Sequence, residues 1–383
     1  MLVTDGSHSS PKSTDTGEYM VSVKDFTPYG FDFSSCKRIS SEDYAALKRN
    51  GCVPKVGDIL VGKDGARYFE DIIIYDQPEH PALLSSIAIL RCNPQEIVSE
   101  FLYYLMKTPS FKQDVRDNYG SGSAIPRIIL KDFKRMPIQY PAIDEQEKIC
   151  SLLSRIDGKI KVNIQINDNL YAQAKAIFAQ RFIGIETIPD GWKKGNLLDI
   201  ANYLNGLAMQ KFRPRDDEVG LPVLKIKELR QGSCDVSSEL CSPSIKPEYI
   251  VHDGDVIFSW SGSLLVDIWC GGTCGLNQHL FKVTSETYDQ WFYYLWTAHH
   301  LERFIAIAAD KATTMGHIKR GELEKAEVLI PSEKDYKEIS SLMNPLFNLI
   351  IANRIEARKL AELRDELLPK LMSGEIDVSE VSI

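Results

Sequence analysis

Two long stretches of the chain carry apolar residues at alternating intervals of four and three residues. In the first stretch the repeat positions are Ile149, Leu153, Ile156, Ile160, Asn163, Leu170 and Ile177. In the second they are Ile339, Met343, Leu346, Ile350, Asn353, Leu360 and Leu367. A heptad pattern sustained over several turns is typical of coiled-coil helices. The pattern therefore predicts two long helices that pack on each other along one seam.

The sequence also marks where these helices begin and end. Asp144, followed three residues later by Glu147, has the pattern of an N-cap with its capping-box partner. Gly184 and Gly374 follow the last repeat positions as helix stops. Because proline lacks an amide hydrogen, we expect Pro345 to interrupt and kink the second helix.

Two asparagines occupy equivalent positions in the predicted seam, Asn163 and Asn353. A polar residue buried in a seam can fix the register of the two helices at some cost in stability. Alternatively, both side chains lie at the edge of the seam in water. The sequence leaves both alternatives open.

The chain repeats itself. Pro141 and Ile128 recur 190 residues later as Pro331 and Ile318, and Gly57 to Leu60 resembles Gly254 to Ile257 at an offset of 197. A repeat of this kind dictates the architecture. We therefore predict an α+β fold: two pseudo-symmetric domains, rich in short strands and glycine-containing loops, separated by two long antiparallel helices that form a coiled coil.

The repeat predicts five segments. They are a first domain over 1–143, a first helix over 144–183, a second domain over 184–331, a second helix over 332–374 and a C-terminal tail over 375–383. The segment from Gly191 to Ile200 has no counterpart in the first domain, because Met1 falls at about the level of Ala201. We expect either a shortened N-terminus, which we favour, or a permuted chain in which Ile376 to Val378 fills this slot.

Composition narrows the class of protein. Of 383 residues, 44% are hydrophobic and 26% charged, which is ordinary for a globular protein. No apolar run approaches the ~18 residues of a membrane span, and the N-terminus resembles no signal peptide, so we expect a cytoplasmic protein. The net charge of −8 argues weakly against nucleic acid, but affinity for DNA depends on where Lys and Arg meet phosphates.

Catalytic motifs are missing from the sequence. It contains no phosphate-binding P-loop, no dinucleotide-binding glycine loop and no nucleophile elbow. Asn93-Pro94 starts like the catalytic tetrapeptide of an amino-methyltransferase but continues with Gln95-Glu96. We therefore expect no catalytic residue, no metal and no cofactor in this chain.

Two alternative functions stay open. Cys270 and Cys274, with His279 downstream, form the one cluster that suggests zinc, although structural zinc sites usually show tighter paired spacing. The first alternative is thus a zinc- or thiol-dependent enzyme that uses the cysteine-rich second domain. The second is a coiled-coil adaptor that does not bind DNA.

The whole chain resembles the specificity subunit of type I restriction–modification enzymes. The resemblance depends on the two-copy plan and on short motifs whose order is specific although each alone is weak. These motifs are Asp5-Gly6-Ser7-His8 with Pro11-Lys12, the Gly-Asp strand starts, the Ser-rich loop before Ile128, Pro141 leading into Glu145-Gln146, Ile188-Pro189-Asp190-Gly191-Trp192, Leu367-Leu368, Lys370-Leu371 and Ser373-Gly374-Glu375-Ile376.

The resemblance implies a function. Each globular half would be a target recognition domain that reads one part of a split, asymmetric site on double-stranded DNA. The helix pair would set the gap between the parts and dock two modification (methyltransferase) subunits, which bring S-adenosylmethionine. A restriction subunit, a translocase and nuclease that uses ATP and Mg, would join them, so that all catalysis lies in the partners.

Glycine-rich loops, which permit close backbone approach, and nearby cations supply the candidate DNA contacts. In the first domain they are Ser7, His8, Lys12, Lys24, Lys63, Arg67, Ser121, Ser123 and Arg127. In the second they are Lys211, Arg213, Lys225, Trp260, Ser261, Ser263, Lys311, Thr313, Thr314 and Lys319. Phosphate contacts would position each domain, and a few base-edge contacts would specify the sequence.

Overall fold

A computed structural model describes residues 1–120, 126–185, 187–310 and 318–381. The chain divides into two compact units. The first unit comprises Met1–Lys161 and Ala361–Ile383, and the second comprises Val162–Leu360. Each unit therefore holds a globular part and one portion of each long helix.

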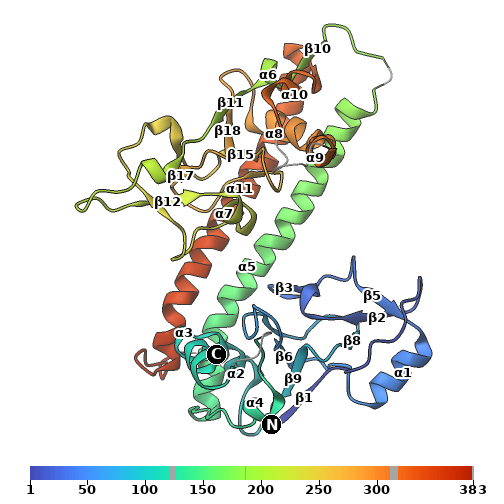
Figure 1. The fold of residues 1–383 in the computed structure, drawn as a ribbon, viewed down its shortest axis with the longest axis vertical. Helices are drawn as coiled ribbons and strands as arrows, with labels where there is room; N and C mark the ends of the chain where they lie inside the picture. Colours follow the sequence, from blue (N-terminus) through green and yellow to red (C-terminus); the bar gives the residue numbers. More distant parts are fainter. Residues whose placement is uncertain (121–125, 186, 311–317, 382–383) are drawn as a thin grey trace. The chain divides into compact units, whose positions relative to one another are not determined.

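The first unit is built on a four-stranded antiparallel sheet with the strand order β1-β9-β6-β7 (Figure 1). A smaller sheet has the order β5-β2-β8, and a short hairpin joins β3 to β4. The bounds of these strands are β1 Leu2–Asp5, β2 Glu18–Val21, β3 Phe26–Thr27, β4 Gly30–Phe31, β5 Lys37–Ile39, β6 Ile59–Gly62, β7 Ile72–Ile74, β8 Ala82–Leu83 and β9 Ile87–Arg91. The helices are α1 Ser41–Arg49, α2 Ser99–Lys107, α3 Pro109–Asn118 and α4 Leu130–Phe133.

The second unit repeats this plan with the sheets β11-β18-β15-β16 and β13-β12-β17-β14, and adds the pair β10-β19. Its strands are β10 Lys193–Asn196, β11 Asn202–Asn205, β12 Leu221–Leu224, β13 Leu240–Cys241, β14 Ile250–Val251, β15 Val256–Ser259, β16 Leu265–Ile268, β17 Cys274–Leu276, β18 Leu280–Thr284 and β19 Glu327–Ile330. Its helices are α6 Leu197–Ile200, α7 Ile226–Gln231, α8 Gln290–His299, α9 Leu301–Asp310 and α10 Arg320–Glu324. The predicted α+β duplication is confirmed.

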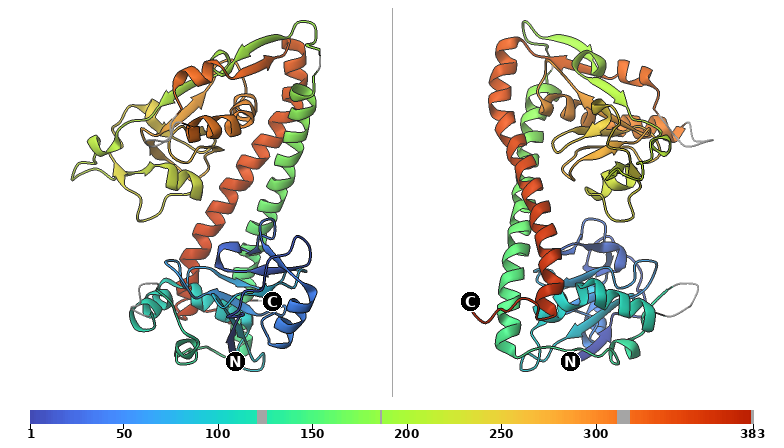
Figure 2. Two further views of the ribbon diagram at one scale, coloured as in Figure 1. Left: turned by 45° about the vertical axis from the view of Figure 1, so that its right-hand side comes forward. Right: turned by 90° about the vertical axis from the view of Figure 1, so that its left-hand side faces the viewer.

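Two long helices complete both units. α5 runs over Ile143–Phe178 and continues as a π turn over Ala179–Ile183, and α11 runs over Glu333–Met372. Within the second unit, the amide of Asn167 donates to the carbonyl of Ile350, while that of Asn163 donates to the carboxylate of Glu356. Partners rise in number along α5 as they fall along α11, so the helices are antiparallel. Figure 2 shows them side by side in both views.

Within the first unit, the same two helices meet through an ion pair whose side chains are 15% and 13% exposed. Arg364 of α11 donates to Asp157 of α5 at 2.7 Å, and Tyr104 of α2 donates to the same carboxylate at 2.8 Å.

The two asparagines of the predicted seam lie in the second unit. Asn163 and Asn353 are 1% and 8% exposed, so the buried alternative for these asparagines is confirmed.

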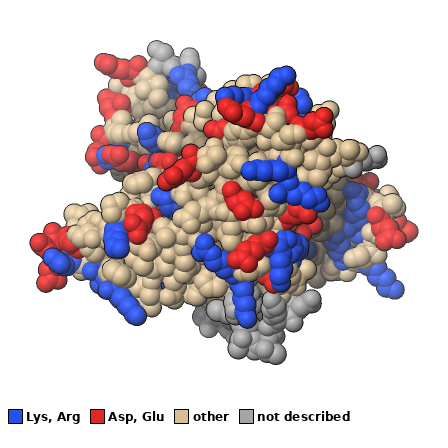
Figure 3. All heavy atoms as spheres, turned by 90° about the horizontal axis from the view of Figure 1, so that it is seen from above, with Lys and Arg blue, Asp and Glu red and all other residues tan. Residues whose placement is uncertain are grey.

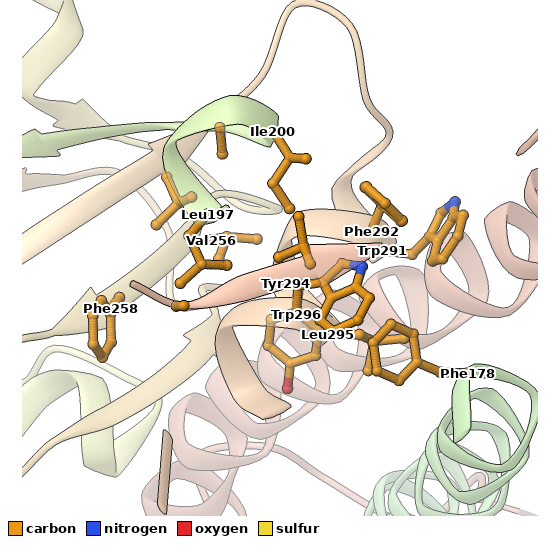
Figure 4. Packing of buried hydrophobic residues seen from close by; sticks show 14 of the residues in the cluster. Phe178, Leu197, Ile200, Val256, Phe258, Trp291, Phe292, Tyr294, Leu295 and Trp296 are labelled. Carbon is orange, nitrogen blue, oxygen red and sulfur yellow. The ribbon is translucent and has the colours of Figure 1, made fainter. Parts of the chain in front are cut away.

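The long helices are also part of the core of each unit. Ile149 and Leu153 of α5 pack with α2 and the sheet of the first unit. In the second unit, Phe178 of α5 packs among Trp291, Phe292 and Trp296 of α8 (Figure 4). Apolar burial of this extent is the dominant stabilising term in folding. Each globular part is therefore fastened to the helix pair.

One prediction about the second helix is wrong. α11 continues through Pro345 without interruption. Proline removes one backbone hydrogen bond, but Met343 and Phe347 on either side of it are buried in the core of the second unit. This packing holds the helix together across the missing bond.

The first unit differs from the second where the sequence lacks a counterpart. β10 pairs with β19 in the second unit, whereas residues 137–140, which correspond to β19, form no strand. Val378 of the tail is buried in the core of the first unit, and Lys148 donates to the carbonyl of Ser379 at 2.7 Å. The tail thus contributes to the core of the first unit.

Candidate nucleic-acid interface

One loop begins at the same point of the fold in each unit. Lys63 follows β6, and its carbonyl accepts from the amide of Ile128 at 2.9 Å. Trp260 follows β15, and its carbonyl accepts from the amide of Ile318 at the same distance. Lys63 and Trp260 are therefore structurally equivalent, and so are the two loops that they begin.

The side chain of Lys63 is fastened inside the first unit. Its ammonium lies 3.5 Å from Asp5 and 3.6 Å from Asp64, and it is 9% exposed. His8 lies 3.4 Å from the same oxygen of Asp5 and projects into solvent. A charge removed from water needs such partners. Lys63 thus holds the base of the loop, and Ala66 and Arg67, later in the same loop, are exposed.

Trp260 makes the equivalent contact with different chemistry. Its indole nitrogen donates to Asn205 at 2.9 Å, and Asn205 ends β11 as Asp5 ends β1. The ring also packs beside Phe281 and His279. Ser261 is buried, and its hydroxyl lies 3.0 Å from Nδ1 of His279. The second loop therefore begins on a hydrogen-bonded cluster that contains no carboxylate.

Several exposed candidates of the first unit lie beside its loop. Lys24, Arg67 and Asp64 line a cavity of about 500 Å³ together with Gly62 and Gly65. Arg67 reaches Asp71 at 2.8 Å but keeps most of its side chain in water. The other exposed candidates are His8, Lys12 and Arg127, while Ser7 is buried and donates its hydroxyl to the carbonyl of Ser9.

In the second unit, the exposed candidates are Lys211, Arg213, Ser263 and Lys319. Lys225 is half-buried, and both it and Arg213 pair with Glu239. The hydrogen bond and charge of Lys225, followed by those of Arg213, lower the pKa of Glu239. The predicted contacts Ser121, Ser123, Lys311, Thr313 and Thr314 lie outside the described residues.

Sequence reasoning missed the partners that shape these loops, Asp5, Asn205 and, as a hydrogen-bond partner, His279. Asp5 lies 58 positions before Lys63 and Asn205 lies 55 before Trp260. The signal available in the sequence was the similarity of these two separations, since Asp5-Gly6 and Asn205-Gly206 stand at matching places in the two copies. In the structure, the amides of Gly6 and Gly206 both donate to a carbonyl of the neighbouring strand.

Charges of both signs are interspersed on the face shown in Figure 3. The cysteines of the second unit give the zinc alternative no support, because Cys270 and Cys274 belong to different apolar clusters. Within the part of the chain that the structure describes, no group of three or more His, Cys, Asp or Glu could hold a metal ion. None of the described helices is long and apolar enough for a membrane span.

Comparison with known proteins gives one family. A model described as the type I restriction modification DNA specificity domain matches residues 18–172 and again 189–364. The chain is 29% identical over 310 residues to the type I restriction enzyme MjaIX specificity subunit of Methanocaldococcus jannaschii, covering 74% of this chain and 71% of that one. It is 19% identical to the HindI specificity subunit of Haemophilus influenzae, covering 90% of each chain.

A solved structure agrees with the fold. The crystal structure of the type I restriction–modification S subunit from M. genitalium matches with a TM-score of 0.51 and 15% identity, covering 93% of this chain and 92% of that one. Specificity subunits are the non-catalytic members of their enzymes, and catalysis lies in partner subunits. The resemblance expected from the motifs is confirmed: with two matches to the DNA specificity domain across most of its length, the chain belongs to the family of type I restriction–modification specificity subunits.

Proposed function

We propose that this chain reads a split, asymmetric site on double-stranded DNA, with one half-site for each unit. The observation that carries the proposal is the equivalence of the loops at Lys63 and Trp260. The two loops share a backbone framework but differ in side chains. Two such surfaces suit two unlike half-sites, since base edges in the major groove are distinguished by the side chains that meet them.

The exposed cations around each loop serve as phosphate contacts, which position a protein on DNA without reading its sequence. They are His8, Lys12, Lys24, Arg67 and Arg127 in the first unit, and Lys211, Arg213, Lys225 and Lys319 in the second. Ser263 and the candidates outside the described residues contact bases or phosphates. Ser7, Lys63 and Ser261 support the loops from within, and Trp260 presents one edge of its half-buried ring.

The long helices act as the spacer and as the docking surface for two methyltransferase subunits. Leu342 and Leu349 are seven residues apart on the part of α11 that belongs to the second unit, so they form one stripe. They are 48% and 46% exposed, so the seam does not use them. In this assembly the methyltransferase subunits supply S-adenosylmethionine, and a restriction subunit supplies the ATP- and Mg-dependent reactions.

The test is to express the chain with its adenine methyltransferase partner and map methylated adenines by sequencing. We expect two short specified blocks separated by an unspecified gap. Arg127→Met should weaken binding of the half-site that the first unit reads. Lys319→Met should weaken binding of the half-site that the second unit reads. Arg135→Met, which removes an exposed cation paired with Asp132 on α4, is the matched control. Methylation without sequence preference would refute the proposal and favour an adaptor.

A further inference from the structure

Two arginines of α11 join the recognition sheet of the second unit to the helix. Arg354 grips Asp267 of β16 with two hydrogen bonds, of 2.9 and 2.7 Å. Arg358, one turn later, donates to Asp253 at 2.8 Å. Asp253 precedes β15, the strand that leads into the Trp260 loop. Both arginines therefore act on the β15–β16 hairpin.

These contacts are not ordinary surface ion pairs. All four side chains are between 23% and 29% exposed. Burial disfavours the charged guanidinium of Arg354, but the hydrogen bonds and charge of Asp267 outweigh it and raise the pKa of Arg354. Bidentate Arg–carboxylate pairs add geometric specificity as well as energy. The Arg354 pair thus opposes rotation of the hairpin against the helix.

The turn that receives Arg358 is itself rigid. The second oxygen of Asp253 accepts from the amide of Gly272 at 2.7 Å, and the carbonyl of Gly272 accepts from the indole of Trp269 at 2.6 Å. Trp269 is fully buried. A side chain at Gly272 would approach the Arg358 guanidinium within 3.3 Å. The guanidinium therefore lies directly against a fixed corner of the sheet.

The apolar core cannot supply the same constraint. Contacts such as that of Phe178 with Trp296 hold α8 against the helices, but hydrophobic attraction has no preferred direction. Val256, Phe258 and Ile268 of the hairpin pack in the same core as α11, and the two ion pairs add contacts of fixed direction to that packing. Ser340 of α11 also donates to Asp289, but Asp289 precedes α8 and not the hairpin, so the direction in which the Trp260 loop points relative to α11 depends on Arg354 and Arg358.

We propose that Arg354 and Arg358 are positioning residues that make this chain strict about the length of the gap between its half-sites. The inference rests on the proposed function. One helical turn of B-DNA rises ~34 Å over ~10 base pairs, so adding one base pair moves a half-site by about 3.4 Å and turns it by about 36° about the duplex axis. A recognition domain that follows that turn must rotate on α11, and the arginines resist the rotation.

The experiment uses the full complex of this chain with its methyltransferase subunit. Methylation rates are measured on duplexes with the natural gap and with gaps one base pair longer or shorter. In Arg354→Met/Arg358→Met we expect discrimination between natural and altered gaps to fall about tenfold, the ratio that corresponds to losing one charge-assisted hydrogen bond. Lys337→Met, which removes an exposed cation paired with Glu333 elsewhere on α11, should leave discrimination unchanged.

A second pair of changes guards against misfolding. Asp253→Asn/Asp267→Asn keeps the side-chain shapes and removes the charges, and should relax gap discrimination in the same direction. The double variant Arg354→Asp/Asp267→Arg restores an ion pair with the charges exchanged, and it should recover part of the gap discrimination. Unchanged discrimination in the folded variants, as judged by thermal unfolding, overturns the inference. If the unaltered chain directs no sequence-dependent methylation, the proposed function itself fails, which is a different result.

Discussion

Lys63 and Trp260 stand at the same backbone position of the two units, yet one is held by carboxylates and the other by an amide. The partner also comes from the same place in each unit: Asp5 is the last residue of β1 in the sheet β1-β9-β6-β7, and Asn205 is the last residue of β11 in the sheet β11-β18-β15-β16. The duplicated fold therefore keeps a contact between two positions while its chemistry changes. Such a contact allows the loops to diverge without loss of the framework beneath them.

Replacing Lys63 tests this arrangement. Lys63→Met leaves Asp5 and Asp64 facing each other without the intervening cation. We expect the free energy of unfolding of the first unit to fall by about 2 kcal/mol, the cost of leaving a buried polar group unpaired. Urea denaturation measures it. Lys12→Met removes an exposed cation and should change stability little, so an equal loss in both variants would contradict the structural role of Lys63.

Asn163 offers a test of the seam. Its amide oxygen is buried without a hydrogen-bond partner among the described residues. Asn163→Leu should therefore raise the free energy of unfolding by about 1 kcal/mol, because a buried polar residue in a seam costs stability.

Asn163→Asp is the matched opposite change at this position. It would place a carboxylate beside that of Glu356, which the Asn163 amide now contacts at 2.7 Å. We expect a loss of about 2 kcal/mol at neutral pH, since a desolvated charge next to a like charge is disfavoured. Should both variants unfold at the same urea concentration, the seam would not be as closely packed as described.

The exposed stripe of α11 predicts the effect of a single charge. Leu349→Glu should abolish co-purification with the methyltransferase subunit and leave the chain folded, because this side chain is largely in water before the partner binds. The matched control is Val219→Glu, which adds the same charge at a side chain that is 90% exposed in the globular part of the second unit. Retained association of Leu349→Glu would exclude this stripe as the docking surface.

His300 predicts a dependence of stability on pH. Burial lowers its pKa below the ordinary value of 6.5, outweighing the bond that joins its Nε2 to the carbonyl of Glu327 at 2.8 Å. As pH falls through 6.5, the unfolded chain takes up a proton that the folded chain resists, so stability is lost toward acid and is fully present above 6.5. The neighbouring His299 is shifted in the same direction.

His300→Gln keeps a donor near Glu327 and removes the titration. The difference in free energy of unfolding between pH 7.5 and pH 5.5 should therefore be smaller in this variant. A difference equal to that of the unaltered chain would show that other groups cause the acid sensitivity.

The long helices were predictable because a heptad pattern reports directly on a buried face. The offset of 190 also holds along both helices, from the pair Ile149 and Ile339 to the pair Leu170 and Leu360. Contact residues were harder to predict. Lys63 and Ser261 stand in glycine-rich loops, a composition typical of exposed segments, yet both are buried. Their burial depends on partners distant in sequence, Asp5 and His279, which no local pattern reveals.

The packing of the helices also indicates how relatives of this chain could acquire new specificities. Ile149 to Leu153 and Tyr171 to Phe178 of α5 are committed to the cores of the globular parts, whereas residues 158–162 belong to neither core. The same is true of residues 359–363 on α11, which lie between Arg358 and Arg364. Insertions of matching length in these two middle segments would disturb neither globular core. Under the proposed function, evolution can therefore change the spacing of the recognised blocks and their identity as separate, heritable traits.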